Sequence, residues 1–152
     1  MLKSTLPLIL LTAILSTCTP PDIAPASNSE PRKDPSSPTG YYIPRDLNDA
    51  LVELDRIMGD KGRAEVLAAK EQDMANYHHG PGTWIRNNWG LWDSNSRLAQ
   101  YFRKIGARHP DDMSGIILKS YWRKLHNQPI DLEGQLKYYN DYWDKLKAQQ
   151  QQ

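Results

Sequence analysis

The sequence predicts an all-α fold, a small bundle of five or six helices that follows a signal peptide and a disordered tether. In the middle and second half of the chain, apolar residues recur at steps of three and four, the period of one helix face. Strand signals are nearly absent, and the only valines are Val52 and Val66. Of the 152 residues, about 107 remain for this domain, enough to fold without metals or disulfides.

Capping residues set the expected boundaries of the first three helices. Asp46 can cap a helix that ends near Gly59. Its apolar residues at helical spacing are Leu47, Ala50, Leu51, Leu54, Ile57 and Met58. Asp60 can cap a second helix that runs to about Ala75, and a short helix framed by glycines is expected over 81–88.

The next two helices are marked by glycine and proline. Ser94 can cap a segment over 95–105, and Gly106 stands where that helix would end. Pro110 fits the first turn of a helix that runs to about His126. The apolar face of this helix consists of Met113, Ile116, Ile117, Tyr121 and Leu125.

The last expected helix begins after Asp131. Its apolar face consists of Leu132, Leu136, Tyr139, Trp143 and Leu146. The helical domain is therefore expected over 41–147, and 148–152 is a short glutamine tail that we interpret as a frayed helix end.

The first residues of the chain carry an export signal, predicted over 1–17. Lys3 supplies a positive charge, and 6–15 is an apolar stretch of roughly ten residues, too short to span a bilayer. The only cysteine, Cys18, follows in the run Leu-Ser-Thr-Cys, which resembles the lipobox of bacterial lipoproteins. The alternative is an ordinary secreted protein that is cleaved after Ala26.

The lipoprotein resemblance implies acylation of Cys18, for example with palmitate, and a stable membrane anchor. In such proteins of Gram-negative bacteria an aspartate after the cysteine favours the inner membrane. Thr19 stands there, which favours the outer membrane, facing the periplasm. Residues 18–40 are rich in proline and serine and are predicted to form a tether. The expected partners are the membrane and an envelope protein or cell-wall ligand. Nucleic acid is not expected, because the net charge is +1 and no basic stripe is present.

The densest group of aromatic residues lies in 78–92, His-His-Gly-Pro-Gly-Thr-Trp-Ile-Arg-Asn-Asn-Trp-Gly-Leu-Trp. Trp84 and Trp92 can stack on a flat ligand, while Arg86 and Asn87 can form hydrogen bonds, as a sugar or peptide site needs. Alternatively, the tryptophans fill the core and the polar residues satisfy loop carbonyls. We expect this second role mainly for the tryptophans, and Arg86 and Asn87 to lie partly exposed.

A second group of polar residues consists of His109, Asp111, Asp112 and Ser114. His109 and Asp112 are candidate ligand-binding residues beside a shallow pocket, and a histidine next to acids can serve acid–base chemistry. Alternatively, the group caps a helix and its acids match the helix dipole. No metal or cofactor is expected, because adjacent acids point about 100° apart on a helix and the His78–His79 pair lacks ligand spacing.

Together these two motifs resemble a bacterial domain family of unknown function. The resemblance rests on 82–92, with a histidine just before it, and on the His-Pro-Asp-Asp of 109–112. Members also open with a short helix of proline followed by an acidic residue, as 43–47 does here. The similarity covers about Tyr41 to Leu125. It implies that the two motifs pack together at the centre of the domain, and it implies no activity.

Two functional hypotheses follow. The first is a lipid-anchored cell-envelope protein with a non-enzymatic helical interaction or ligand-binding module, because the sequence contains no convergent catalytic set. The second is an envelope hydrolase or carbohydrate-active enzyme that uses His109, Asp112 and Arg86.

Overall fold

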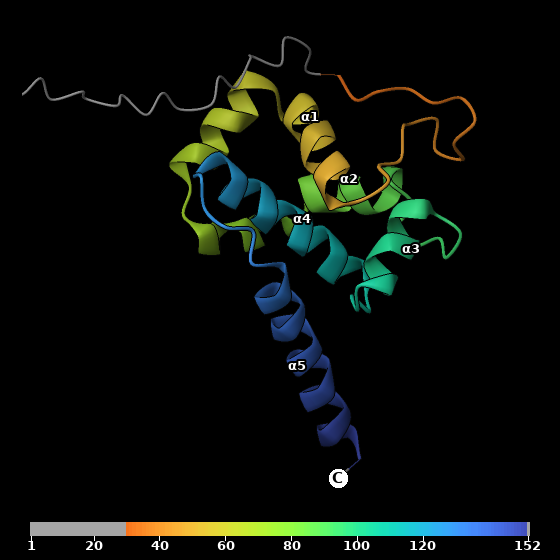
Figure 1. Cartoon of the computed structure of the whole chain (residues 1–152), viewed down its shortest axis with the longest axis vertical. Helices are drawn as coiled ribbons and strands as arrows, with labels where there is room; N and C mark the ends of the chain where they lie inside the picture. Colours follow the sequence, from red (N-terminus) through yellow and green to blue (C-terminus); the bar gives the residue numbers. More distant parts are fainter. Residues whose placement is uncertain (1–29, 152) are drawn as a thin grey trace, which may run out of the picture.

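The computed structural model describes residues 30–151, and this part of the chain contains six helices and no strand (Figure 1). The helices are α1 (Leu47–Ala68), the 3₁₀ helix η1 (Glu71–His78), α2 (Pro81–Asn88), α3 (Arg97–Lys104), α4 (Pro110–Leu125) and α5 (Leu132–Gln150). The predicted all-α fold is confirmed. The predicted signal peptide and Cys18 lie outside the described residues. Within 30–151, no helix combines the length and the apolar character that a membrane crossing needs.

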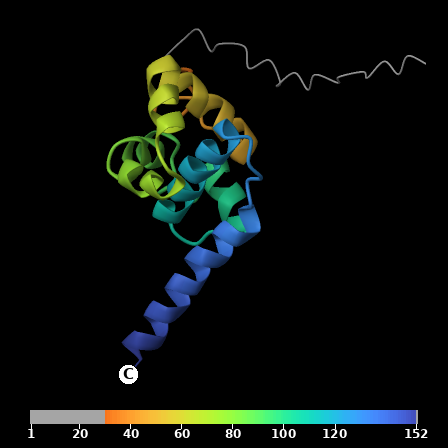
Figure 2. The ribbon, with the colours of Figure 1, turned by 90° about the vertical axis from the view of Figure 1, so that its left-hand side faces the viewer.

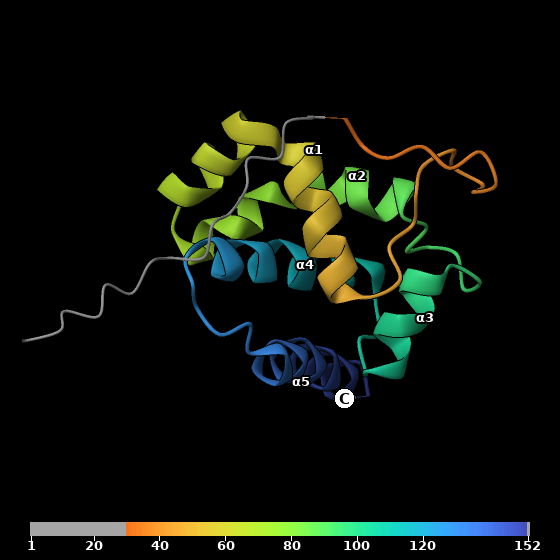
Figure 3. The same ribbon diagram turned by 45° about the horizontal axis from the view of Figure 1, so that its top comes forward.

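Helix α4 forms the centre of the domain. Helices α1, η1 and α2 pack against it, and α5 lies across it from α2 (Figure 3). Pro110 occupies the first turn, as predicted. The predicted apolar face is buried along its whole length: Met113, Ile116, Ile117, Tyr121 and Leu125. Burying each such side chain contributes about 1.5–3 kcal/mol, so this helix supplies much of the core.

Gly59 interrupts α1 near its middle. Its φ of 56° lies in the left-handed region, which glycine tolerates because it has no Cβ. Before this break, the Asp46 carboxylate caps the helix by accepting from the N–H of Asp49 at 2.9 Å, as predicted. After it, the helix ends at Ala68 and not near Ala75.

Two helix boundaries differ from the prediction, and in each case the residue just before the helix makes a hydrogen bond that the sequence did not indicate. The N–H of Lys70 donates to the carboxylate of Asp73 at 3.0 Å, which starts η1 inside the segment that we expected to continue the preceding helix. Helix α3 follows Ser96 and not Ser94. The hydroxyl of Ser96 is buried and donates to the carbonyl of Trp89 at 3.0 Å, which fixes this residue in the core before the helix begins.

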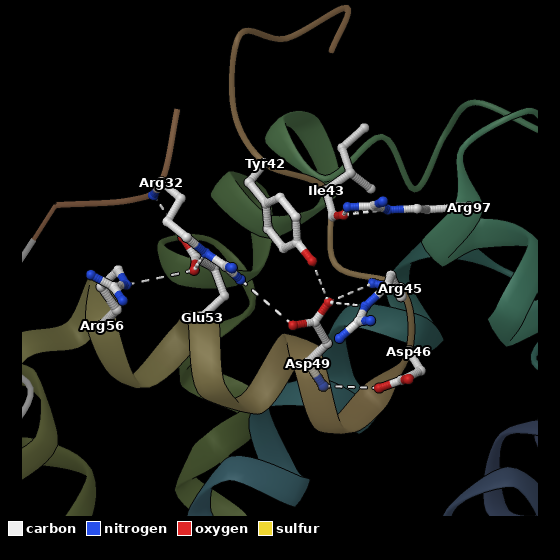
Figure 4. Close-up of polar contacts among 9 residues, drawn as sticks. All are labelled: Arg32, Tyr42, Ile43, Arg45, Asp46, Asp49, Glu53, Arg56 and Arg97. Atoms are coloured by element: carbon white, nitrogen blue, oxygen red, sulfur yellow. Dashed lines mark hydrogen bonds and ion pairs between the residues drawn. The ribbon is translucent and has the colours of Figure 1, made fainter. Parts of the chain in front are cut away.

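Residues 30–42, here called the N-terminal strap, contact α1 near both ends, at Arg32 and Tyr42 (Figure 4). The backbone N–H of Arg32 donates to the carboxylate of Glu53 at 2.7 Å, and its guanidinium donates to the same carboxylate. Glu53 is 0% exposed. The hydroxyl of Tyr42 donates to Asp49 at 2.6 Å. The packed region therefore begins earlier than predicted, because polar contacts hold a segment whose composition offers little apolar surface.

Helix α5 projects from the body of the domain, and its C-terminal end lies far from the other helices (Figures 1 and 2). The Asp131 side chain caps it by accepting from the N–H of Gly134 at 3.2 Å, as predicted. Near its start the amide of Gln135 is buried and donates to the carbonyl of Ile130 at 2.7 Å. The helix continues to Gln150, through most of the segment that we expected to fray.

Candidate ligand-binding groove

A groove of about 650 Å³ lies between η1, α4 and α5. The side chains that line it from α5 are all aromatic: Tyr138, Tyr139, Tyr142 and Trp143. The other lining residues come from η1 and α4: Glu71, Gln72, Met74, Ala75, His78, Asp111, Asp112, Gly115, Leu118 and Lys119. This volume falls within the range of small-molecule sites, and the lining combines apolar surface with a few polar groups. The groove is therefore the candidate functional site.

Gly115 and Tyr139 form the middle of the groove. A Cβ at position 115 would overlap the Tyr139 hydroxyl, so the glycine allows this ring to lie directly on α4. Burial raises the pKa of Tyr139 to about 12, and the phenol is therefore neutral at physiological pH. Met74 and Leu118 add apolar surface to the lining.

Basic side chains surround Asp111 at one end of the groove. The Nε of Arg86 lies 3.0 Å from its Oδ1, and the Nε2 of His78 lies 3.8 Å from the same oxygen. Arg86 is 6% exposed, and its remaining nitrogens donate to the hydroxyl of Ser114 at 2.9 Å and to that of Thr83 at 3.1 Å. Arg86 thus fixes Asp111 from behind the groove.

Asp112 is the member of the predicted ligand set that lines the groove. It is buried, and its Oδ2 accepts from the indole N–H of Trp143 at 2.7 Å. Burial raises the pKa of this carboxyl group, although the hydrogen bond from Trp143 opposes the shift. The imidazole ring of His109 lies near Trp143 and Trp92, and its centroid is 5.3 Å and 5.6 Å from the centroids of those two rings. Asp112 therefore joins α4 to α5.

A second charged group stands at the other end of the groove. The Nε of Arg123 and the Nζ of Lys119 lie 2.5 Å and 3.6 Å from Glu71 Oε1. Partial burial would raise the pKa of Glu71, but the hydrogen bonds and charges of Arg123 and Lys119 lower it overall. Both ends of the groove thus carry paired charges, and the one further carboxylate in the lining, Asp112, is held by the indole of Trp143.

The tryptophans of the 78–92 motif do not line the groove, and Trp92 is exposed, whereas Trp84 and Trp89 pack in or against the core. Trp89 is fully buried, and Trp84 is half-buried between Tyr41 and Trp89, with ring centroids 5.4 and 6.0 Å away. The prediction that Arg86 is partly exposed is wrong. Its guanidinium is buried because four neighbouring groups bind it. Asn87 is exposed and lies outside the groove lining.

The aromatic wall that α5 supplies was not predicted from the sequence. Tyr138 is 70% exposed and Tyr142 is 52% exposed, and they stand one helical turn apart. The predicted apolar face of this helix contained only two of its aromatic residues, Tyr139 and Trp143. The sequence does contain a signal for this wall, because aromatic residues stand in adjacent pairs at 138–139 and 142–143. Only one residue of each pair can belong to the apolar stripe that packs on the core, so the other must face a surface.

The groups that could serve catalysis have structural partners. The Ser114 hydroxyl donates to the carbonyl of Asp111 at 2.9 Å, which does not activate it as a nucleophile. The Nδ1 of His109 accepts from the N–H of Asp111 at 3.2 Å and so caps α4. In residues 30–151, no group of three or more His, Cys, Asp and Glu side chains is placed to hold a metal ion. The arrangement is suited to binding.

Comparisons with known proteins assign the chain to a family but identify no characterised relative. No curated protein and no solved structure matches it. A family model described as Domain of unknown function (DUF6794) matches residues 43–125, which include both motifs and helices α1 to α4. This confirms the resemblance inferred from the sequence, and since the match covers more than half of the 152 residues, the chain belongs to the DUF6794 family.

Proposed function

We propose that this protein is a lipid-anchored cell-envelope protein whose helical domain is a non-enzymatic ligand-binding module. The observation that carries the proposal is the groove of about 650 Å³ with four aromatic side chains along one wall. Large exposed aromatic side chains around a cavity are typical of binding surfaces, because they offer apolar contact area at a small entropic cost.

Binding is favoured over catalysis because the acids of the groove are already engaged. Asp111 is paired with Arg86, Asp112 accepts from Trp143, and Glu71 is paired with Arg123. A general acid or base must be within hydrogen-bond reach of a reacting group and free to exchange a proton with it. These carboxylates instead hold the helices that form the groove.

The anchor determines where the module works. Twelve peptide units separate Cys18 from Glu30, and a fully extended chain of that length spans about 40 Å at most. The strap is fixed to α1 beyond this point. A domain anchored through Cys18 is therefore restricted to ligands close to the membrane surface, such as components of the envelope.

Two measurements on the full chain test the proposal. In detergent phase partitioning we expect the wild type in the detergent phase and Cys18→Ser in the aqueous phase, because acylation needs the thiol. Equal partitioning of the two proteins would contradict the anchor. With peptidoglycan fragments and model esters as substrates we expect no turnover. Turnover that His109→Ala abolishes without loss of helix signal would overturn the binding module and favour the hydrolase.

A further inference from the structure

We infer that the ligand of the groove is a neutral sugar chain that runs along α5. This inference rests on the proposed function, since it names the class of ligand that the module binds. Three properties of the groove support it: the arrangement of its aromatic side chains, the balance of its charges and the absence of backbone groups that an extended peptide could pair with.

The first property is the pair of exposed aromatic rings on α5. Tyr138 and Tyr142 stand four residues apart, which places them about 6 Å apart along the helix axis. A sugar ring presents C–H groups on a flat face that packs on an aromatic ring, and consecutive sugars repeat this face along a chain. Two rings on one side of a groove suit a ligand with such a repeat better than one compact molecule.

The second property is the balance of charges. Arg86 lies 3.0 Å from Asp111 at one end, and Arg123 lies 2.5 Å from Glu71 at the other. Paired charges do not attract an ion strongly, because a charged ligand must lose its hydration without gaining a free counter-charge. They still offer oxygen acceptors, and His78 and Lys119, which are partly exposed, add polar atoms. A hydroxyl group both donates and accepts, so a neutral polyol suits this lining.

The third property concerns the backbone around the groove. Its walls are η1 and α5 and its floor is α4, and the backbone groups inside a helix bond to one another. Residues 30–151 contain no strand with an open edge, so the strand-addition mode of peptide binding is not available in this part of the chain. Recognition must come from side chains, as it does for sugars on aromatic surfaces.

The test is an NMR titration of the full ¹⁵N-labelled chain in a mild detergent. The probe is the tetramer of β-1,4-linked N-acetylglucosamine, and the comparison ligands are the same tetramer without acetyl groups, which is cationic, and tetra-alanine. We expect the neutral tetramer to shift amides within 71–78, 111–119 and 138–143, with a Kd below about 1 mM. We expect the cationic tetramer to bind more weakly and tetra-alanine to leave these amides unchanged.

Variants separate a groove effect from a general one. Tyr142→Ala should weaken binding of the neutral tetramer about tenfold. Leu67→Ala removes a comparably exposed apolar side chain outside the groove and should leave binding unchanged. Tighter binding of the cationic tetramer, shifts outside the groove, or no shift at about 10 mM neutral tetramer would overturn the sugar inference. If tetra-alanine shifts the groove amides instead, the sugar inference is wrong while the binding module stands.

Discussion

The two segments that flank the family match, the N-terminal strap and α5, are attached to the same core in opposite ways. The strap is fixed through a carboxylate that is 0% exposed, that of Glu53. Helix α5 carries aromatic side chains, yet it leaves Tyr138 and Tyr142 more than half exposed. The difference shows that polar side chains can hold a segment in place while aromatic ones remain available. We therefore interpret the strap as a segment that stabilises the fold and α5 as the wall of the groove that faces the proposed ligand.

The strap predicts the largest effect. Replacing Arg32 by Met leaves Glu53 buried with the backbone N–H of residue 32 as a donor and with only Arg56, 3.8 Å away, as a charged partner. An uncompensated buried charge destabilises strongly, and because Arg32 is partly exposed we expect a loss of about 2–3 kcal/mol in the free energy of unfolding. Urea denaturation measures it. Adding Glu53→Gln should restore part of the loss, since no buried charge remains. A loss below about 0.5 kcal/mol for Arg32→Met would show that the contacts of the strap do not stabilise the fold.

Gly115→Ala should destabilise the contact between α4 and α5. The added methyl group overlaps the Tyr139 hydroxyl, and inserting a group into a packed contact costs about 1–3 kcal/mol. The second change Tyr139→Phe removes the hydroxyl and should recover most of this loss in thermal unfolding. If the double variant is no more stable than Gly115→Ala alone, the hydroxyl is not the obstacle.

Asp49 predicts a pH dependence of the strap. Burial alone would raise its pKa, but hydrogen bonds from Tyr42 and Arg45 lower it from 3.8 to about 2. A lowered pKa contributes stability above the unfolded-state value of 3.8, and this contribution is lost as the pH falls towards 2. We expect about 2 kcal/mol to disappear over this range. In Asp49→Asn the loss between pH 5 and pH 2 should be smaller by that amount, and an unchanged pH profile would contradict the assignment.

Asp112→Asn should change the stability little. The amide oxygen can still accept from the indole of Trp143, and the buried charge is removed. Burial raises the pKa of Asp112 in the folded state, so the ionised form is disfavoured above that pKa and the wild type is less stable there. We expect the variant to equal or exceed the wild type at pH 7 by up to about 1 kcal/mol, and the difference to shrink in acid. A large loss at pH 7 would show that the charge itself is needed.

Local signals explain which parts of the fold could be predicted. Asp46, Pro110 and Asp131 act on their own helix ends, and Gly106 has a φ of 100° where the sequence places a helix stop. Each of these signals is read from a few neighbouring residues. The start of α3 was predicted wrongly because a buried side chain decides it: the hydroxyl of Ser96 donates to the carbonyl of Trp89.

The groove could not be predicted in the same way, because its walls come from segments far apart in the sequence. The sequence indicated Asp112 and a pocket beside the start of the Pro110 helix, but its other candidates, Trp84, Arg86, Asn87, Trp92 and His109, do not line the groove. Arg86 shows why: a guanidinium beside tryptophans has the composition of a ligand site, and only the position of α4 reveals that its partners are Ser114 and Asp111. The strap was missed because Arg32 and Glu53 meet across 21 residues.

The central claim is that the exposed aromatic face of α5 is kept for a ligand and does not stabilise the fold. The free energy of unfolding of the double variant Tyr138→Ala and Tyr142→Ala, measured in urea against the wild type, tests it most directly. Because both side chains are more than half exposed, we predict a change within about 1 kcal/mol and an unchanged slope. A loss of about 3 kcal/mol or more, typical of truncating a packed aromatic residue, would show that these tyrosines belong to the core and would contradict the claim.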